Sequence, residues 1–185
     1  AIDASVTQEK EDLVRIFRKN PDTSLKIIQG RADNVKEELL DSRFIHFGGH
    51  YSLQEEVDAF RAGDIAALDL SQTRFVFLNG CHTALADGSQ RSLAEAFIDA
   101  GVHDFVGFGL PVETRKAQRI SGALWPLILK GESPLIVLQK VRASLRETGS
   151  LDWLSLQHFA SVADRSEPGR WRMIFLTGVA AVILV

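Results

Sequence analysis

The chain has 185 residues, of which 45% are apolar and 24% charged, and its formal net charge is −3. This length is sufficient for a domain with a sizeable core, and the composition is that of an ordinary soluble globular protein. The weakly acidic balance excludes a basic surface for nucleic acid. A single cysteine, Cys81, excludes an internal disulfide framework and is typical of a reducing, cytoplasmic compartment.

Helices and strands are predicted to alternate along the chain, because segments of helical periodicity alternate with short apolar runs. Leu13 and Phe17 lie at helical spacing in the first of these segments. The predicted order is a helix over 6–20, a strand over 25–29, a helix over 35–40, a strand over 44–47, a strand over 75–78, a helix over 93–100, a strand over 104–110, helices over 114–129 and 133–146, and a strand at the end of 151–162. This order predicts an α/β fold with a mainly parallel sheet.

Two of the predicted strands end in residues that can carry chemistry. Residues 75–78 contain no polar position, as expected for a central parallel strand, and an Asn-Gly pair then leads to Cys81. Residues 44–47 are followed by two glycines and His50. Because ligands of open parallel sheets bind beyond the carboxyl ends of the strands, we expect His50 and Cys81 to lie close together there.

A thiol and an imidazole at one sheet edge are typical of nucleophilic catalysis. Cys81 becomes a useful nucleophile when a neighbouring base such as His50 takes its proton, and the same imidazole can then protonate a leaving amine. The bland alternative for Cys81 is a small buried apolar side chain. His46 lies inside an apolar strand and is predicted to be structural, bonded to a backbone group, whereas His103 and His158 show no partner in the sequence.

Two cofactor sites are alternatives to a catalytic dyad. A metal site would use His46, His50, Cys81 and His82, but no carboxylate or second cysteine completes the set. A dinucleotide site would need a G-x-G-x-x-G motif after the first strand, and neither this motif nor a P-loop lysine is present. We therefore expect no metal and no cofactor.

The last residues of the sequence are unusually apolar. Residues 173–185 contain no charge, and these thirteen residues are fewer than the roughly 20 that a helix needs to cross a bilayer. Two interpretations stay open: a buried final strand or core helix, or the beginning of a membrane span with basic flanking residues on the cytoplasmic side. The predicted organisation is a domain over 1–163, a polar basic linker over 164–172 and an apolar segment over 173–185.

Four segments, in this order, resemble the CHAT domain, a caspase-like cysteine protease module often joined to tetratricopeptide repeats. They are IQGRADNVKEELLDSRFIHFGGH at 28–50, GDIAALDLSQTRFVFLNGCHT at 63–83, SLAEAFIDAGVHDFVGFGLPVE at 92–113 and LILKGESPLIVLQKVRASLR at 127–146. Trp153 resembles the late tryptophan of the family. The resemblance covers most of the chain. The first strand of the family would precede Ala1.

The resemblance implies a three-layer αβα sandwich of the caspase–haemoglobinase type, with a His/Cys dyad. It makes His50 the general base and acid and Cys81 the nucleophile. The backbone N–H groups of Tyr51 and Cys81 would be the oxyanion donors. The family usually has Gly where this chain has Tyr51, directly after the histidine.

The resemblance also implies a function and its partners. The expected activity is that of a cysteine endopeptidase acting on a protein or peptide substrate, regulated by other domains of a longer chain or by a regulatory protein. Asn79, two residues before Cys81, is the candidate that the resemblance gives for lining the substrate site, and Glu113 and Asp87 are further candidates because of their position in loops. The alternative is an inactive CHAT-like pseudoprotease that serves as a scaffold or binds a partner, with a membrane anchor if the apolar segment is a span. The expected location is the cytoplasm, or a membrane with the domain facing the cytoplasm.

Overall fold

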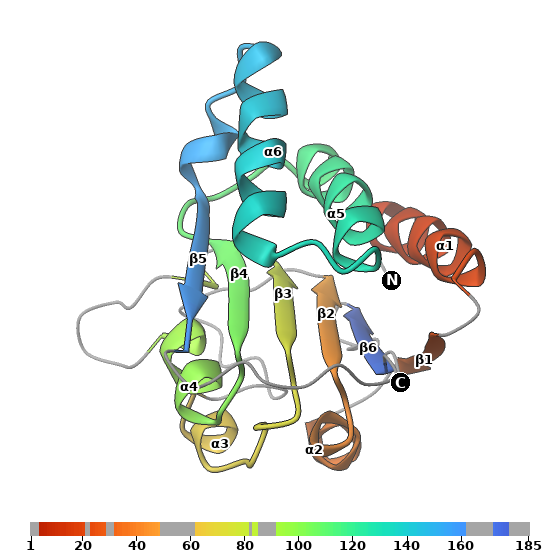
Figure 1. Cartoon of the computed structure of the whole chain (residues 1–185), viewed down its shortest axis with the longest axis vertical. Helices are drawn as coiled ribbons and strands as arrows, with labels where there is room; N and C mark the ends of the chain where they lie inside the picture. Colours follow the sequence, from red (N-terminus) through yellow and green to blue (C-terminus); the bar gives the residue numbers. More distant parts are fainter. Residues whose placement is uncertain are drawn as a thin grey trace.

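The computed structural model describes residues 4–20, 23–28, 32–48, 62–81, 83–84, 92–161 and 172–177. Their strands form one six-stranded sheet in the order β1-β6-β2-β3-β4-β5 (Figure 1). Every neighbouring pair is parallel except β4 and β5, which are antiparallel. The strands are β1 (Ser24–Ile28), β2 (Phe44–Gly48), β3 (Phe75–Asn79), β4 (Asp104–Phe108), β5 (Leu156–Ala160) and β6 (Arg172–Thr177).

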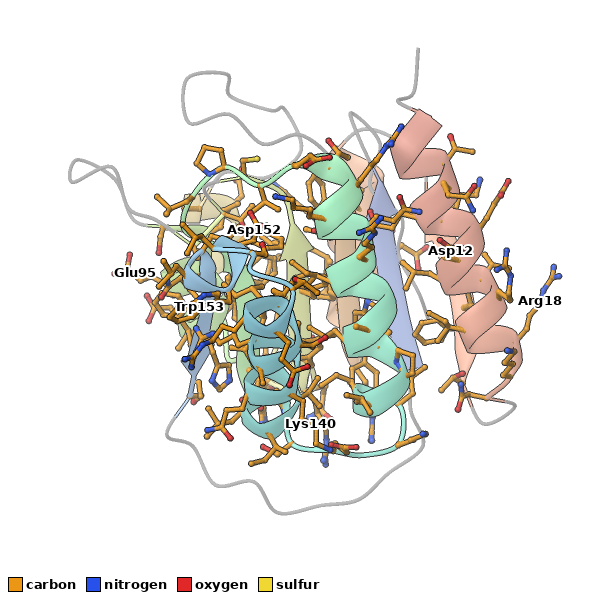
Figure 2. All side chains as sticks on the ribbon, turned by 90° about the horizontal axis from the view of Figure 1, so that it is seen from above. Asp12, Arg18, Glu95, Lys140, Asp152 and Trp153 are labelled. Carbon is orange, nitrogen blue, oxygen red and sulfur yellow. The ribbon has the colours of Figure 1, made fainter. Side chains whose placement is uncertain are left out.

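Helices cover both faces of this sheet. On one face lie α1, α5 and α6, with α5 between the other two, and on the opposite face lie α2, α3 and α4 (Figures 1 and 2). The predicted three-layer αβα sandwich with a mainly parallel sheet is therefore confirmed. The helices are α1 (Ala4–Arg18), α2 (Ala32–Leu40), α3 (Ala62–Ala66), α4 (Leu93–Asp99), α5 (Thr114–Ile128), α6 (Pro134–Glu147) and the 3₁₀ turn η1 (Asp152–Leu154).

The central strands are buried along their whole length because helices cover them on both sides. All five residues of β2, of β3 and of β4 are buried, which confirms the apolar runs as central strands. Trp125 of α5 is a centre of the core, with its ring edge-on to Phe17, Phe44 and Phe75 at centroid distances of 5.9, 6.2 and 5.3 Å. The core thus fixes the strands that lead to the candidate site.

Local signals set where α4 begins. The Ser92 hydroxyl accepts a hydrogen bond from the Glu95 backbone N–H at 3.1 Å, and the Glu95 carboxylate accepts one from the Ser92 N–H at 2.9 Å. This reciprocal pair is a capping box, which satisfies two of the N–H groups that a helix start leaves without partners.

Part of the apolar C-terminal segment belongs to the sheet. Strand β6 begins at Arg172, lies between β1 and β2 and is parallel to both. Residues 172–177 therefore form a strand, and the remaining residues of the segment, 178–185, lie outside the described part of the chain. None of the helices that the structure describes combines the length and apolarity needed to span a membrane.

Candidate active site

The carboxyl ends of β2 and β3 lie side by side in register. Gly48, the last residue of β2, pairs with Asn79, the last residue of β3. His50 follows the first strand by two residues, and Cys81 follows the second by two. The register therefore gives the two residues equivalent positions along neighbouring strands. His50 lies outside the described residues, so its approach to Cys81 stays a prediction.

Cys81 lies in the turn after β3 and is half-buried. Its Sγ is 3.8 Å from the carbonyl oxygen of Val112, a weak contact of the kind a protonated thiol makes. Val112 belongs to the loop between β4 and α5. Among the hydrogen bonds of the described residues, none uses the backbone N–H of Cys81.

The turn after Cys81 is held by the hydroxyl of Thr83. This buried Oγ1 lies 3.0 Å from the carbonyl oxygen of Gly80 and 3.2 Å from that of Leu78, and it accepts a hydrogen bond from the Phe108 N–H at 3.2 Å. One side chain thereby connects the cysteine turn to the ends of β3 and β4. These contacts hold the turn that carries Cys81 in a fixed position relative to the sheet.

A buried polar cluster lies against the ends of the same two strands, and we call it the Glu9 cluster: Glu9, His46, Asn79 and Trp125. The Glu9 carboxylate, on α1, accepts a hydrogen bond from Asn79 Nδ2 at 2.5 Å and lies 3.1 Å from His46 Nε2. On its other side His46 accepts a hydrogen bond at Nδ1 from the indole Nε1–H of Trp125, at 2.9 Å. Glu9 is 5% exposed, Asn79 6%, and His46 and Trp125 not at all.

This arrangement determines the protonation of His46. Burial lowers the pKa of the imidazole below its ordinary value, and the neighbouring Glu9 carboxylate opposes this effect in part. Because Nδ1 accepts a hydrogen bond from Trp125, the single proton of the neutral ring lies on Nε2, which faces Glu9. His46 is therefore a neutral link between α5 and α1.

Comparison with protein families agrees with this geometry. A family model, the CHAT domain, matches residues 4–184. The chain belongs to the CHAT domain family. This membership places it in a caspase-like protease family, and the matched region includes β6 as well as the strands that precede His50 and Cys81. No curated protein matches the sequence.

Two candidate substrate residues of the CHAT domain lie in very different surroundings. The Asn79 amide is buried and donates to Glu9, so its Nδ2 faces α1. Glu113 lies on the loop between β4 and α5, where its side chain is 60% exposed, and it forms an ion pair with Lys116 at 3.8 Å. Their contact with substrate stays a prediction. Tyr51 and Asp87, the other predicted site residues, lie outside the described residues.

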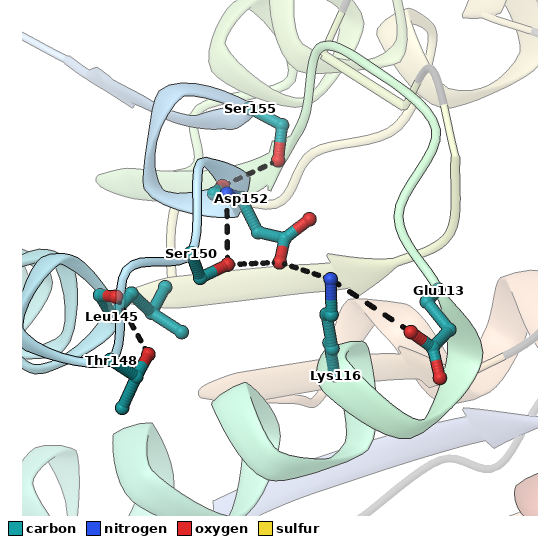
Figure 3. Close-up of polar contacts among 7 residues, drawn as sticks. All are labelled: Glu113, Lys116, Leu145, Thr148, Ser150, Asp152 and Ser155. Carbon is teal, nitrogen blue, oxygen red and sulfur yellow. Dashed lines mark hydrogen bonds and ion pairs between the residues drawn. The ribbon is translucent and has the colours of Figure 1, made fainter.

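A second polar network anchors the loop that reaches Cys81. Lys116, near the start of α5, pairs with Asp152 of η1 at 3.1 Å as well as with Glu113 (Figure 3). The Ser150 hydroxyl also donates to the Asp152 carboxylate. This hydrogen bond is the main reason that the pKa of Asp152 is lowered, and the nearby Lys116 ammonium lowers it further. The network thereby fixes η1 against the start of α5 and the loop that carries Val112.

Sequence reasoning did not identify Glu9 and Trp125, although one signal was present. Glu9 precedes Leu13 by four residues and Phe17 by eight, so an acidic residue lies on the apolar face of α1, and all three are buried. A buried carboxylate requires a partner, and its helical position indicates that the partner lies under α1. No comparable signal pointed to Trp125, because a tryptophan on an apolar helix face is explained by burial of its ring and indicates no polar partner.

The structure gives side-chain partners to two other histidines. His46 is structural, as predicted, and its imidazole contacts the side chains of Trp125 and Glu9. His158, for which the sequence showed no partner, has its Nε2 2.8 Å from Oδ1 of Asp104. Among the described residues no group of His, Cys, Asp and Glu could hold a metal ion, whereas His50 and His82 lie outside them.

A cavity of about 500 Å³ opens between α5 and α6. Lys116, Val141 and Gly149 are among the residues that line it, and Cys81 is not. It therefore lies in the helical layer rather than at the strand ends.

Proposed function

We propose that this CHAT domain is a cysteine endopeptidase in which Cys81 is the nucleophile and His50 the general base and acid. The observation that carries the proposal is the register of β2 and β3, in which Gly48 pairs with Asn79 two residues before His50 and Cys81. Neighbouring positions at the carboxyl edge of a parallel sheet are where such folds bind and transform ligands. Family membership supports the same assignment.

The reaction needs two bond exchanges. His50 takes the proton from the Cys81 thiol, and the thiolate attacks the carbonyl carbon of the scissile peptide bond. The carbonyl electrons move to oxygen, and the resulting oxyanion accepts hydrogen bonds from the backbone N–H groups of Cys81 and Tyr51. The C–N bond then breaks, and the amine leaves with the proton from His50. Water hydrolyses the thioester, which releases the carboxylic acid and restores the thiol.

Two features of the described residues support this assignment. The Cys81 N–H takes part in none of the hydrogen bonds among them, as an oxyanion donor requires. The Thr83 hydroxyl fixes the turn that presents this N–H and the thiol. A single cysteine is typical of a reducing compartment, so we propose that the activity lies in the cytoplasm. Its substrate would be a protein or peptide, and other domains or a regulatory protein would control it.

The second candidate function is that of an inactive scaffold or partner-binding module. Tyr51 favours it, because a side chain directly after the histidine stands where the CHAT family usually has Gly. A side chain at that position can crowd the oxyanion site.

Covalent labelling separates the two functions. We would treat the protein with a panel of peptidyl acyloxymethyl ketones that carry an acidic, basic or apolar residue before the reactive group, and locate the adduct by mass spectrometry. The proposal predicts one adduct on Cys81, lost in Cys81→Ala, strongly slowed in His50→Ala and retained in the control His103→Ala. Labelling that persists in Cys81→Ala contradicts the assignment, and a wild-type protein that reacts with no member of the panel favours the scaffold.

A further inference from the structure

We propose that Glu9 is a positioning residue that holds the ends of β2 and β3, and with them the residues of the dyad, in the arrangement that catalysis needs. The inference rests on the proposed function. Glu9 lies on α1, far from Cys81 in the sequence, and the proposed mechanism gives it no bond to make or break. Its effect is transmitted through the backbone of the two strands.

The first argument is that one carboxylate contacts both strands. Glu9 Oε1 accepts a hydrogen bond from Asn79 at the end of β3 and lies 3.1 Å from His46 Nε2 in β2. Asn79 precedes Cys81 by two residues, and His46 precedes His50 by four. A hydrogen bond to an ionised group in a buried site is stronger than one between neutral groups. The carboxylate therefore contacts both strand ends at once, through a hydrogen bond from β3 and a close approach to β2, and this fixes how they lie relative to each other.

The second argument is the close fit between Glu9 and β2. A Cβ added at Gly48 would lie 2.7 Å from Glu9 Oε2, closer than real side chains come. The absence of a side chain at Gly48 thus lets the carboxylate lie directly against the strand that leads to His50. A side chain at Gly48 would therefore displace the carboxylate from this position.

The third argument is that α1 is itself firmly placed. Asp12 lies on the side of α1 that faces α5 (Figure 2), and its Oδ2 accepts a hydrogen bond from Gln118 Nε2 at 3.0 Å. Phe17 contacts Trp125, whose indole donates to His46. The position of Glu9 is therefore set by α5 as well as by its own helix. A shift of α1 would break the contacts of Glu9 to both strands at once, so the position of α1 affects the ends of β2 and β3.

The test compares variants of the full chain that differ in the acceptor at position 9. Glu9→Leu keeps a similar volume and removes the acceptor, whereas Glu9→Gln keeps a side-chain oxygen that can accept from both neighbours. Glu11→Gln on the exposed side of the same helix is the matched control. Inactivation by the reactive ketone is separated into its maximal rate and its half-saturating concentration, at a temperature where circular dichroism shows each variant folded.

We expect the maximal rate to be at least tenfold lower in Glu9→Leu, at an unchanged half-saturating concentration. Glu9→Gln should recover most of this rate, and the control Glu11→Gln should react like the wild type. A folded Glu9→Leu protein that reacts at the wild-type maximal rate overturns the proposal. If Glu9→Leu does not fold, Gly48→Ala applies the same test, because its Cβ displaces the carboxylate but leaves it present.

A different readout separates this inference from the proposed function. If the wild-type protein reacts with no ketone, the endopeptidase assignment fails, and alkylation of Cys81 by iodoacetamide is then compared between the wild type and Glu9→Leu. A rate changed by threefold or more shows that Glu9 governs the surroundings of Cys81. Equal rates in two folded proteins contradict it.

Discussion

The indole of Trp125 donates a hydrogen bond to the imidazole of His46 across the buried contact between α5 and β2, with Nε1 and Nδ1 2.9 Å apart. Neither ring is exposed to solvent. The bond determines which ring nitrogen carries the proton, and it thereby presents an N–H to Glu9. The packing of one helix is in this way linked to the polar cluster that lies against the strand ends.

Trp125→Phe keeps an aromatic ring in the core and removes the donor. Because the Nδ1 of His46 then stays buried without its partner, we expect the free energy of unfolding to fall by about 1–3 kcal/mol, in addition to the effect of the smaller ring. Urea denaturation measures the change. Trp153→Phe is the control, since Trp153 lies half-buried beneath Arg146. An equal loss in this control would show that the hydrogen bond from Trp125 to His46 adds nothing to the free energy of unfolding.

The free energy of unfolding should depend on pH through His46. Burial lowers the pKa of its folded-state imidazole below the ordinary 6.5, so between these two values the unfolded chain binds a proton that the folded chain does not. Stability is then complete above pH 6.5 and decreases as the pH falls below it, by at most about 1.4 kcal/mol per pH unit. Urea denaturation between pH 7.5 and 5.5 measures the slope.

The control for this slope is a pair of histidine variants. His46→Gln should lose most of the pH dependence, whatever its absolute stability, whereas His103→Gln should keep it. An unchanged slope in His46→Gln would assign the effect to other groups.

Gly107→Ala tests the support of the cysteine turn. A Cβ at this position in β4 would lie 2.7 Å from Thr83 Oγ1 and 3.0 Å from the ring of Phe105, so the hydroxyl has to move. Because small displacements of a reacting group are costly, we expect labelling of Cys81 to slow by about 10- to 100-fold. Gly122→Ala in α5 is the matched control, since nothing lies within 4 Å of its added Cβ; both variants reacting like wild type would contradict this role of Thr83.

Ser92→Ala should affect stability without affecting the site. It removes the acceptor of the capping box that begins α4, and losses of this kind amount to about 0.5–2 kcal/mol. Thermal unfolding followed by circular dichroism measures the decrease. The rate of Cys81 labelling, measured well below the unfolding transition, should stay at the wild-type value, and a slower rate would mean that α4 also shapes the site.

Much of the fold was predictable from the sequence, because the local signals agree with the final environment. The apolar run that begins at Phe75 has no polar position and is the central strand β3, and Ser92 begins the predicted helix α4. Strand β1 and helices α1, α5 and α6 also lie where periodicity predicted them, with ends that differ by a few residues.

The remaining features depend on contacts between distant segments. Glu9 lies against Asn79 and His46 only because α1 packs against α5 and β2, and no local pattern contains that information. The apolar residues from Met173 onward suited a strand, a core helix or a membrane span equally well, since an uncharged run carries no periodicity. The pairing of Cys81 with His50 was predicted from strand order and stays a prediction, because the described register ends at Gly48 and Asn79.

The position of β6 has a consequence for the order of folding. The last strand that the structure describes lies between β1 and β2, which come from the first third of the 185 residues, so those two strands do not pair directly with each other. Contacts between residues so far apart in sequence form slowly, because the intervening chain must first lose much of its freedom. During synthesis, β1 and one edge of β2 therefore lack their β6 partner until residues 172–177 have left the ribosome. The sheet, and the pairing of the strand that leads to His50, are completed only after residues 172–177 have been made.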